Sequence, residues 1–280
     1  MKAMNLKGRW VLVTGASSGL GAEMARVLAR EHQANVVLVA RRLDKLEALE
    51  KELEAQHQVD VRCIAADLSR EDEAERLFQV ATGEIDLHAA VLNAGVTHFG
   101  HHDELSWDAF KQMLALNIVT TTRLTSLLLP YLERRGENGA VMLVSSMAGL
   151  APTPYQSAYS ATKAYLINYG CSLHHEMAPR GVSVTTFAPG GIITDMTAGE
   201  RFNSLRGWLM PVDVCARAAI KALTRREYLS VPGFVYRVGS VLTRLLPQRF
   251  FAAKVAAQYR KSLLDSGAAA PSPASRPTQP

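Results

Sequence analysis

Apolar residues along the first 190 positions follow two alternating patterns. Short runs rich in valine, isoleucine and leucine predict buried strands. These runs occupy residues 10–15, 35–40, 59–67, 85–93, 140–146 and 182–189. The segments between them carry apolar residues three or four positions apart, as at Leu20, Met24 and Val27, which is typical of helices. We therefore expect a doubly wound α/β fold, in which helices cover both faces of a parallel sheet.

The helices expected between these strands are marked by their apolar faces. The apolar face of the highly charged helix after the second strand consists of four residues: Leu43, Leu46, Leu49 and Leu53. The other expected helices lie around Leu77 and Phe78, from about 107 to 132, from the stretch YSATK onward and over 211–225. A last strand is expected at 228–232.

The chain after Pro189 follows this alternation less closely. Residues 195–210 fit a loop with helical turns. The tail SGAAAPSPASRPTQP is rich in proline, serine and alanine, so it has little to bury and should be disordered. We therefore expect a single catalytic domain over 1–232, a helical C-terminal extension over 233–265 and a disordered tail over 266–280.

The extension is basic and amphipathic, and it is broken by Pro247. Arg237 and Arg244 lie on one face, and the apolar residues lie on another: Phe234, Val238, Val241, Leu242 and Leu245. Such a helix can lie on an anionic bilayer, which predicts a possible peripheral membrane contact through 234–264. More often, a helix of this kind packs on its own domain and closes the fold.

Composition narrows the class of protein. The chain has 280 residues, 48% hydrophobic and 20% charged, which is enough for one large buried core. Three widely separated cysteines argue against a disulfide framework and a zinc site, and they favour a reducing, cytoplasmic compartment. The polar start MKAMNLKGRW is no secretory signal, and no run of eighteen apolar residues predicts a membrane span.

The net charge is only weakly informative. A surplus of +5 with 7% aromatic residues is weak evidence for nucleic acid, and we expect no nucleic-acid partner. The surplus suits an anionic cofactor or an anionic membrane surface.

A glycine-rich turn, TGASSGLG at 14–21, joins the first strand to the first helix. Its glycines at 15, 19 and 21 permit a tight turn and let phosphate oxygens approach the backbone of Ser17, Ser18 and Leu20. The helix N-terminus then favours negative charge there. The spacing differs from GxGxxG, so a plain tight connection is the alternative interpretation.

The stretch YSATK places Tyr159 and Lys163 one helical turn apart, on the same face of a helix. A phenol has a pKa near 10, and a cation beside it is expected to lower that pKa. The pair then forms a general acid/base tuned toward neutral pH. The alternative is an ordinary pair of surface side chains.

Four motifs, in this order and spacing, resemble those of the short-chain dehydrogenase/reductase family: TGASSGLG, LNAG at 92–95, Ser146 and YSATK. The resemblance covers roughly residues 8–230 and implies a Rossmann-type fold with a nicotinamide cofactor. It implies that Tyr159 is the acid/base, that Lys163 also holds the nicotinamide ribose and that Ser146, rather than Ser145, hydrogen-bonds the substrate oxygen. Asn117 matches the asparagine that kinks the long helix and holds a water, or else is a surface amide.

The same resemblance assigns further cofactor contacts. Asp67 and Leu68 would contact the adenine, Asn93, Ala94 and Gly95 would lie under the adenine ribose, and Ile192 and Thr194 would lie near the nicotinamide. Asp67 also fits the N-cap of a helix.

The end of the second strand decides between NAD and NADP. An NAD enzyme needs a carboxylate there, but this chain has Arg41 and Arg42 and no acid before Asp44. A guanidinium suits a 2′-phosphate, so we expect NADP(H), with Arg41 as the main contact and Ser17 adding a hydroxyl. The alternative is a solvated arginine pair.

The expected function is an NADPH-dependent ketoreductase. Apolar residues in 147–155 and 195–210 predict a lipophilic substrate such as a ketoacyl, steroid or polyketide-like ketone, unless they pack on the core or on a second subunit. The resemblance also implies a homodimer or homotetramer. One alternative is an enzyme of the same fold that runs in the oxidative direction on an alcohol, and another is a non-catalytic NADP(H)-binding sensor or scaffold.

Three histidines close together, His98, His101 and His102, raise the question of a metal. Their spacing suits no familiar metal site, so we expect solvated histidines and no metal.

Overall fold

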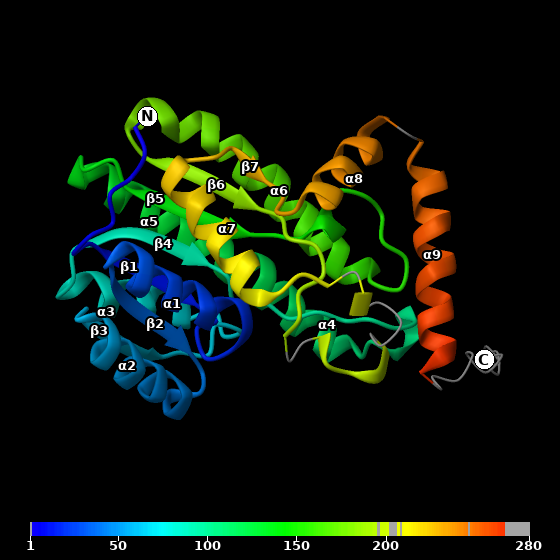
Figure 1. The fold of residues 1–280 in the computed structure, drawn as a ribbon, viewed down its shortest axis with the longest axis horizontal. Helices are drawn as coiled ribbons and strands as arrows, with labels where there is room; N and C mark the ends of the chain where they lie inside the picture. The colour runs from blue at the N-terminus through cyan, green and yellow to red at the C-terminus, as the bar shows by residue number, and fades with distance from the viewer. Residues whose placement is uncertain (1, 195–196, 202–205, 208, 246, 267–280) are drawn as a thin grey trace, which may run out of the picture.

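A seven-stranded parallel sheet forms the centre of the computed structural model, which describes residues 2–194, 197–201, 206–207, 209–245 and 247–266. The strand order is β3-β2-β1-β4-β5-β6-β7 (Figure 1). The strands are β1 Trp10–Thr14, β2 Asn35–Ala40, β3 Val61–Ala65, β4 Leu87–Leu92, β5 Ala140–Val144, β6 Ser183–Phe187 and β7 Leu229–Ser230. This order reverses direction between β1 and β4, which confirms the doubly wound fold expected from the sequence.

Helices cover both faces of the sheet because successive strand residues point to opposite sides. Val11 and Val13 join one hydrophobic cluster, while Leu12 joins the other. The first cluster packs under α1 Gly19–His32, α2 Leu43–His57 and α7 Val212–Arg225. The second packs under α3 Glu73–Gly83, α5 Thr121–Arg135 and α6 Ser157–Met177. Both faces of every central strand are therefore buried.

Three of the four leucines that mark the apolar face of the second helix are buried. Leu46, Leu49 and Leu53 are buried in the first cluster, as expected. Leu43 is 42% exposed, because it is the first residue of α2 and lies ahead of the turns that reach the sheet. Leu43 therefore lies at the exposed end of the apolar face that these four leucines mark.

The long helix expected over 107–132 consists of three parts. These are α4 Trp107–Leu114, a π-helical segment Ala115–Thr120, and α5. Trp107–Arg135 as a whole is long and apolar enough to cross a membrane. In this fold, however, Leu124, Leu128 and Leu132 are buried against the sheet, so this half of the segment is a core helix.

The C-terminal extension folds as two helices, α8 Phe234–Leu245 and α9 Gln248–Asp265, which contact each other beside one end of the domain (Figure 1). The ring of Tyr259 on α9 packs edge-on against Phe99, 5.0 Å between centroids. The hydroxyl of Ser262 donates to the carbonyl of Arg201 at 2.6 Å. The inner face of α9 is therefore joined to loops of the catalytic domain.

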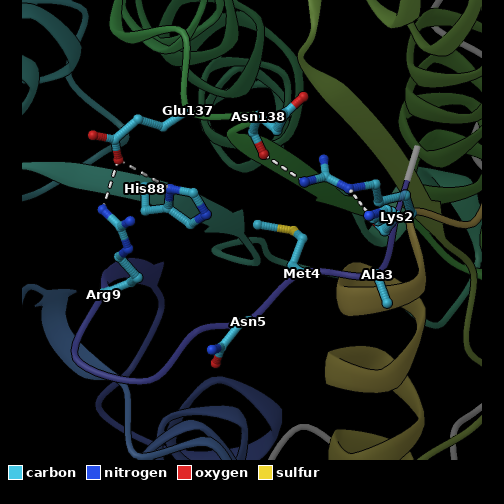
Figure 2. Close-up of a pocket in the computed structure, with 9 residues that line it drawn as sticks. Lys2, Ala3, Met4, Asn5, Arg9, His88, Glu137 and Asn138 are labelled. Atoms are coloured by element: carbon cyan, nitrogen blue, oxygen red, sulfur yellow. Dashed lines mark hydrogen bonds and ion pairs between the residues drawn. The ribbon is translucent and has the colours of Figure 1, made fainter.

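A cavity of about 390 Å³ lies at the amino ends of the strands (Figure 2). Arg9 and His88 line it, with Glu137 accepting from Arg9 at 2.7 Å. At its side, Arg226 donates to the carbonyls of Lys2, Asn138 and Gly139 and to the hydroxyl of Ser183. Arg226 therefore joins the N-terminal segment before β1 to β6 and to the segment that enters β5.

This arrangement predicts the effect of Arg226→Gln on stability. Removing the guanidinium leaves several half-buried acceptors without their donor, which should lower the free energy of unfolding by about 1–3 kcal/mol. The measurement is urea unfolding followed by circular dichroism. Arg225→Gln, at the exposed neighbouring position, is the control and should change stability by less than about 0.5 kcal/mol. Equal effects of the two substitutions would contradict this role of Arg226.

Candidate active site

The predicted catalytic residues meet at the carboxyl edge of the sheet. Ser146 follows β5, and Tyr159 and Lys163 lie on the first two turns of α6. The Ser146 hydroxyl lies close enough to the phenol of Tyr159 to lower its pKa. The hydroxyl of Ser145 points the other way and donates to the carbonyl of Lys163 at 2.7 Å. The structure therefore places Ser146, and not its neighbour, beside the phenol.

Lys163 is almost completely buried, with 4% of its surface exposed. Its Nζ donates to the carbonyl of Val144 at 2.9 Å and lies 5.7 Å from the centre of the Tyr159 ring. No carboxylate pairs with it among the described residues. Burial therefore lowers the pKa of Lys163 to about 8, because the ammonium form has lost water.

The expected lowering of the Tyr159 pKa is not found. Removal of the phenol from water raises its pKa, and this outweighs the effect of the nearby Ser146 hydroxyl, which acts in the lowering direction. Tyr259 of α9 raises the pKa further. The prediction rested on the neighbouring cation and on the positive charge of an oxidised nicotinamide ring, and it omitted burial, which raises the pKa of the phenol and lowers that of the ammonium. In the protein alone, Tyr159 is therefore a protonated phenol at neutral pH.

Asn117 lies in the π-helical segment and is fully buried, so it is not a surface amide. Its side-chain NH₂ donates to the carbonyl of Val96 at 2.9 Å and to the hydroxyl of Thr162 at 3.0 Å. Its carbonyl accepts from the Val96 N–H at 2.9 Å. The widened turn allows the amide to join the loop after β4 to α6, next to Lys163.

The glycine-rich turn is closely packed against the loop after β4. Gly15 has φ +70°, and a side chain on Gly21 would lie 2.2 Å from the Gly15 carbonyl oxygen. The Asn93 side chain donates to the Thr14 carbonyl at 3.0 Å, and the Thr14 hydroxyl accepts from the Ala94 N–H at 3.0 Å. Only glycine fits at these two positions of the turn, which gives the close backbone cradle that a dinucleotide phosphate needs.

Other predicted residues surround this turn. Ser18 precedes α1 in an extended conformation, and Leu20 is buried in the first cluster, so only its backbone can serve a ligand. A side chain at Gly19 would contact Thr194 at 3.4 Å, which places the segment after β6 over the turn. Gly95 lies against Asn117 and Lys163. The predicted phosphate and nicotinamide segments are therefore neighbours.

The two arginines after β2 differ in their contacts. Arg42 donates through Nη2 to the hydroxyls of Ser17 and Ser18, both at 2.9 Å. Arg41 is exposed, and its charge acts on Asp67 instead. The structure therefore places Arg42, rather than the preferred Arg41, at the glycine-rich turn.

Asp67 does not cap a helix, because the next helix, α3, begins at Glu73. Its carboxylate accepts from the N–H and the hydroxyl of Ser69 at 3.2 and 2.8 Å. Burial by itself would raise the pKa of Asp67, but these two hydrogen bonds and the charge of Arg41 hold it below its ordinary value. Leu68 is 5% exposed, and its carbonyl accepts from the Thr120 hydroxyl at 2.7 Å.

The segments predicted to wall the pocket are described in part, since 195–196, 202–205 and 208 lie outside the described residues. Ile192 forms a short bridge with Met210, which holds the segment after β6 in place. Glu104, next to the histidine cluster, pairs with Arg201 at 2.8 Å. His98 contacts the carbonyl of His101 at 3.1 Å. Among the described residues, no three histidine, cysteine or acidic side chains lie together as ligands of one metal ion.

The sequence left open whether the C-terminal extension packs on its own domain, and α9 does so at the side of the site. Tyr259 packs on Phe99, and Arg260 donates to the hydroxyl of Tyr155 at 3.1 Å. Tyr155 has φ +65°, an unusual conformation for a tyrosine. The amphipathic pattern of the extension indicated a packed face, but it did not indicate which loops that face would contact.

The site and the fold define the class of protein, and a comparison with family models agrees. The model described as short chain dehydrogenase matches residues 9–204. The chain belongs to the short-chain dehydrogenase family, as the sequence motifs predicted.

Individual relatives show how far the likeness extends. The very-long-chain 3-oxoacyl-CoA reductase of Aspergillus clavatus is 34% identical over 212 residues, covering 73% of this chain and 60% of the relative. The inactive hydroxysteroid dehydrogenase-like protein 1 of Homo sapiens is 32% identical over 206 residues, covering 73% of this chain and 62% of the relative. The chain therefore spans about 60% of the length of these curated relatives.

Solved structures extend the likeness to most of the fold. A short-chain dehydrogenase from Sphingobium yanoikuyae, solved in complex with NADPH, has a TM-score of 0.77 and 28% identity to this chain. The comparison covers 85% of this chain and 93% of that one.

The buried lysine predicts a specific pH dependence of stability. Between about pH 8 and the ordinary lysine value of 10.5, the folded protein has lost a proton that the unfolded chain still holds. Stability contributed by this group therefore rises with pH in that window, by at most about 1.4 kcal/mol per pH unit. Lys163→Met should lack this rise. In urea unfolding, the free energy of unfolding of the wild type should therefore increase relative to that of the variant between pH 7 and 10.

The control for this measurement is Lys45→Met on the exposed side of α2. Its difference from the wild type should stay constant over the same pH range. If Lys163→Met also tracks the wild type in parallel, Lys163 does not change protonation between the folded and unfolded states in this window.

Proposed function

We propose that this protein is an NADPH-dependent reductase of lipophilic ketones. The single observation that supports this most strongly is the position of the Ser146 hydroxyl, close enough to the Tyr159 phenol to act on its pKa, with the buried Lys163 one helical turn behind the phenol. A carbonyl oxygen placed between the two hydroxyls would receive a proton from one and a hydrogen bond from the other.

The state of the phenol suggests the direction of the reaction. A bound nicotinamide supplies the hydride in reduction or accepts it in oxidation. A phenol already carries its proton at neutral pH, and burial raises the pKa of Tyr159 further, so the group is present in the protonated form that reduction of a carbonyl needs. Ser146 orients the oxygen that receives the proton. Lys163, with a pKa of about 8, lies close enough to supply positive charge as the phenol gives up its proton.

Arg42 supports the choice of NADP over NAD. A guanidinium that donates to two serine hydroxyls of the glycine-rich turn has a fork of donors where a 2′-phosphate would be held. No carboxylate occupies the end of β2, which an NAD enzyme would use for the ribose hydroxyls. The relative from Sphingobium yanoikuyae, whose structure contains NADPH, adds support from a protein of the same fold.

The surroundings of the site support a lipophilic substrate. Phe99 and Leu263 are buried in a small apolar cluster with Tyr155 and Tyr259 at the side of the site. The relative from Aspergillus clavatus acts, by its name, on very-long-chain 3-oxoacyl-CoA. We propose a ketone on a long acyl chain, or one on a comparably large apolar body, as the substrate class.

A non-catalytic sensor or scaffold is the second candidate, since the human relative bears a name that calls it inactive. Here the serine, the tyrosine, the lysine and the asparagine are all present, with Ser146 near Tyr159 and Asn117 hydrogen-bonded to Thr162 beside Lys163, which favours an enzyme. We also propose self-association through α5 and α6, where Tyr165 is 37% exposed and Val119, in the preceding π-helical segment, is 46% exposed.

Tyr159→Phe tests the proposed acid. Loss of the positioned proton donor should lower turnover at least ~10²-fold, while NADPH still binds, because the phenyl ring keeps the packing. Turnover is followed as NADPH consumption at about 340 nm with ketones of increasing chain length. Tyr165→Phe, on the same helix with its hydroxyl on Thr122, is the control and should keep turnover. Near-normal turnover of Tyr159→Phe would remove the proposed acid.

Arg42→Ala tests the cofactor preference. Loss of the charged donors should weaken NADPH binding about 10- to 100-fold and leave NADH binding unchanged, because only NADPH carries the 2′-phosphate. The affinities are measured by quenching of tryptophan fluorescence. Arg41→Ala is the matched comparison and should have the smaller effect. The opposite order would assign the 2′-phosphate to Arg41, and equal loss of both cofactors would argue against either role.

A further inference from the structure

The net positive charge of this protein comes mainly from its C-terminal helices. Residues 1–233 hold 24 lysines and arginines against 25 acidic residues, so the catalytic domain is close to neutral. Residues 234–266, which form α8 and α9, hold six lysines and arginines against a single acid, Asp265. A charge surplus that gathers on two helices indicates a surface for an anionic partner.

The outer face of α8 is apolar over its first turns. Phe234 is 79% exposed, Val235 64% and Val238 43%, and their spacing places them on one side of the helix. Tyr236 lies on the opposite side, where its ring packs against Gly190 of the catalytic domain. The helix therefore has one face held by the domain and one apolar face directed to solvent.

The outer face of α9 combines cations with apolar side chains. Phe250 is 56% exposed and Leu264 57%, and exposed Lys254 and Lys261 lie on the same face between them. Neither lysine forms an ion pair among the described residues. The inner face, with Tyr259 and Leu263, is buried against the loops at the site.

We propose that the outer faces of α8 and α9, called here the C-terminal surface, dock on an anionic lipid bilayer. Exposed phenylalanine and valine can enter the interface between headgroups and acyl chains, while lysine remains among the lipid phosphates. A second copy of this chain is a poorer partner, because two such surfaces would bring like charges together. Figure 1 shows α8 and α9 as a pair beside the catalytic domain rather than over the sheet.

Docking through this surface gives the site a route to its substrate. The inner face of α9 contacts Phe99 and the strand-end loops, so the bilayer would lie next to the mouth of the active site. A long-chain ketone could then reach the site directly from the membrane. This last step rests on the proposed function, whereas docking itself does not, so binding is measured without any substrate.

The test is co-sedimentation of the full chain with vesicles of phosphatidylglycerol mixed into phosphatidylcholine, compared with phosphatidylcholine alone. We expect binding to the anionic vesicles that weakens as salt is raised, because salt screens the attraction. Each cation near an anionic leaflet contributes about fivefold to partitioning. The double variant Lys254→Glu with Lys261→Glu should therefore bind at least about 25-fold more weakly.

A second variant separates apolar insertion from charge. Phe234→Ser with Val238→Ser should also lower binding at least about 10-fold, since the apolar side chains no longer enter the interface. The matched controls are Lys45→Glu with Lys51→Glu on α2 and Val80→Ser on α3, which lie at exposed positions elsewhere. These controls should bind as the wild type does.

Three results would overturn the proposal. The first is no binding to anionic vesicles at low salt, and the second is equal binding to neutral vesicles. The third is a wild-type dimer, seen by sedimentation equilibrium, that the Phe234 and Val238 substitutions dissociate, since the C-terminal surface would then serve a second copy. Circular dichroism of each variant confirms that a loss of binding is not a loss of folding.

Discussion

The chemistry at this site depends on how closely the first turns of α6 are held against the end of β5. A side chain at Gly149, in the turn after β5, would lie only 2.5 Å from the backbone of Lys163. The hydroxyl of Ser145 fixes the same peptide group from the other side. With this backbone fixed, Tyr159 and Ser146 meet with little conformational freedom, and the order needed in the reaction is already present in the folded protein.

The same close packing sets the charges of the two reacting groups. Burial disfavours both the phenolate of Tyr159 and the ammonium of Lys163. It therefore raises the pKa of the phenol and lowers the pKa of the ammonium, which favours the neutral form of each group. For the phenol, this keeps the proton in place until a carbonyl needs it. For the lysine, it reduces stability at neutral pH, which is tolerated because the Val144 carbonyl accepts a hydrogen bond from Nζ. Function and stability thus have opposite requirements at this lysine.

The parallel sheet could be predicted because the signal is local: each strand shows its own apolar run. That Ser146, Tyr159 and Lys163 lie together could be predicted because they belong to short motifs. The sign of the Tyr159 pKa could not, since it depends on enclosure by residues far apart in the chain, Tyr259 among them. The choice between Arg41 and Arg42 was equally out of reach, because neighbouring residues at a strand end point in different directions and only the fold decides which one meets Ser17.

The contacts of α9 at the site could not be predicted for a related reason. Its two faces have different roles, and the sequence does not separate the residues of one face from those of the other. The inner face is aromatic and is held by single contacts to separate loops, through Tyr259 and Ser262. The outer face is cationic through Lys254 and Lys261. A weakly amphipathic sequence results, in which apolar residues appear on both sides. Deleting the helix would therefore remove a wall of the active site together with the C-terminal surface, so only substitutions confined to the outer face can separate these two roles.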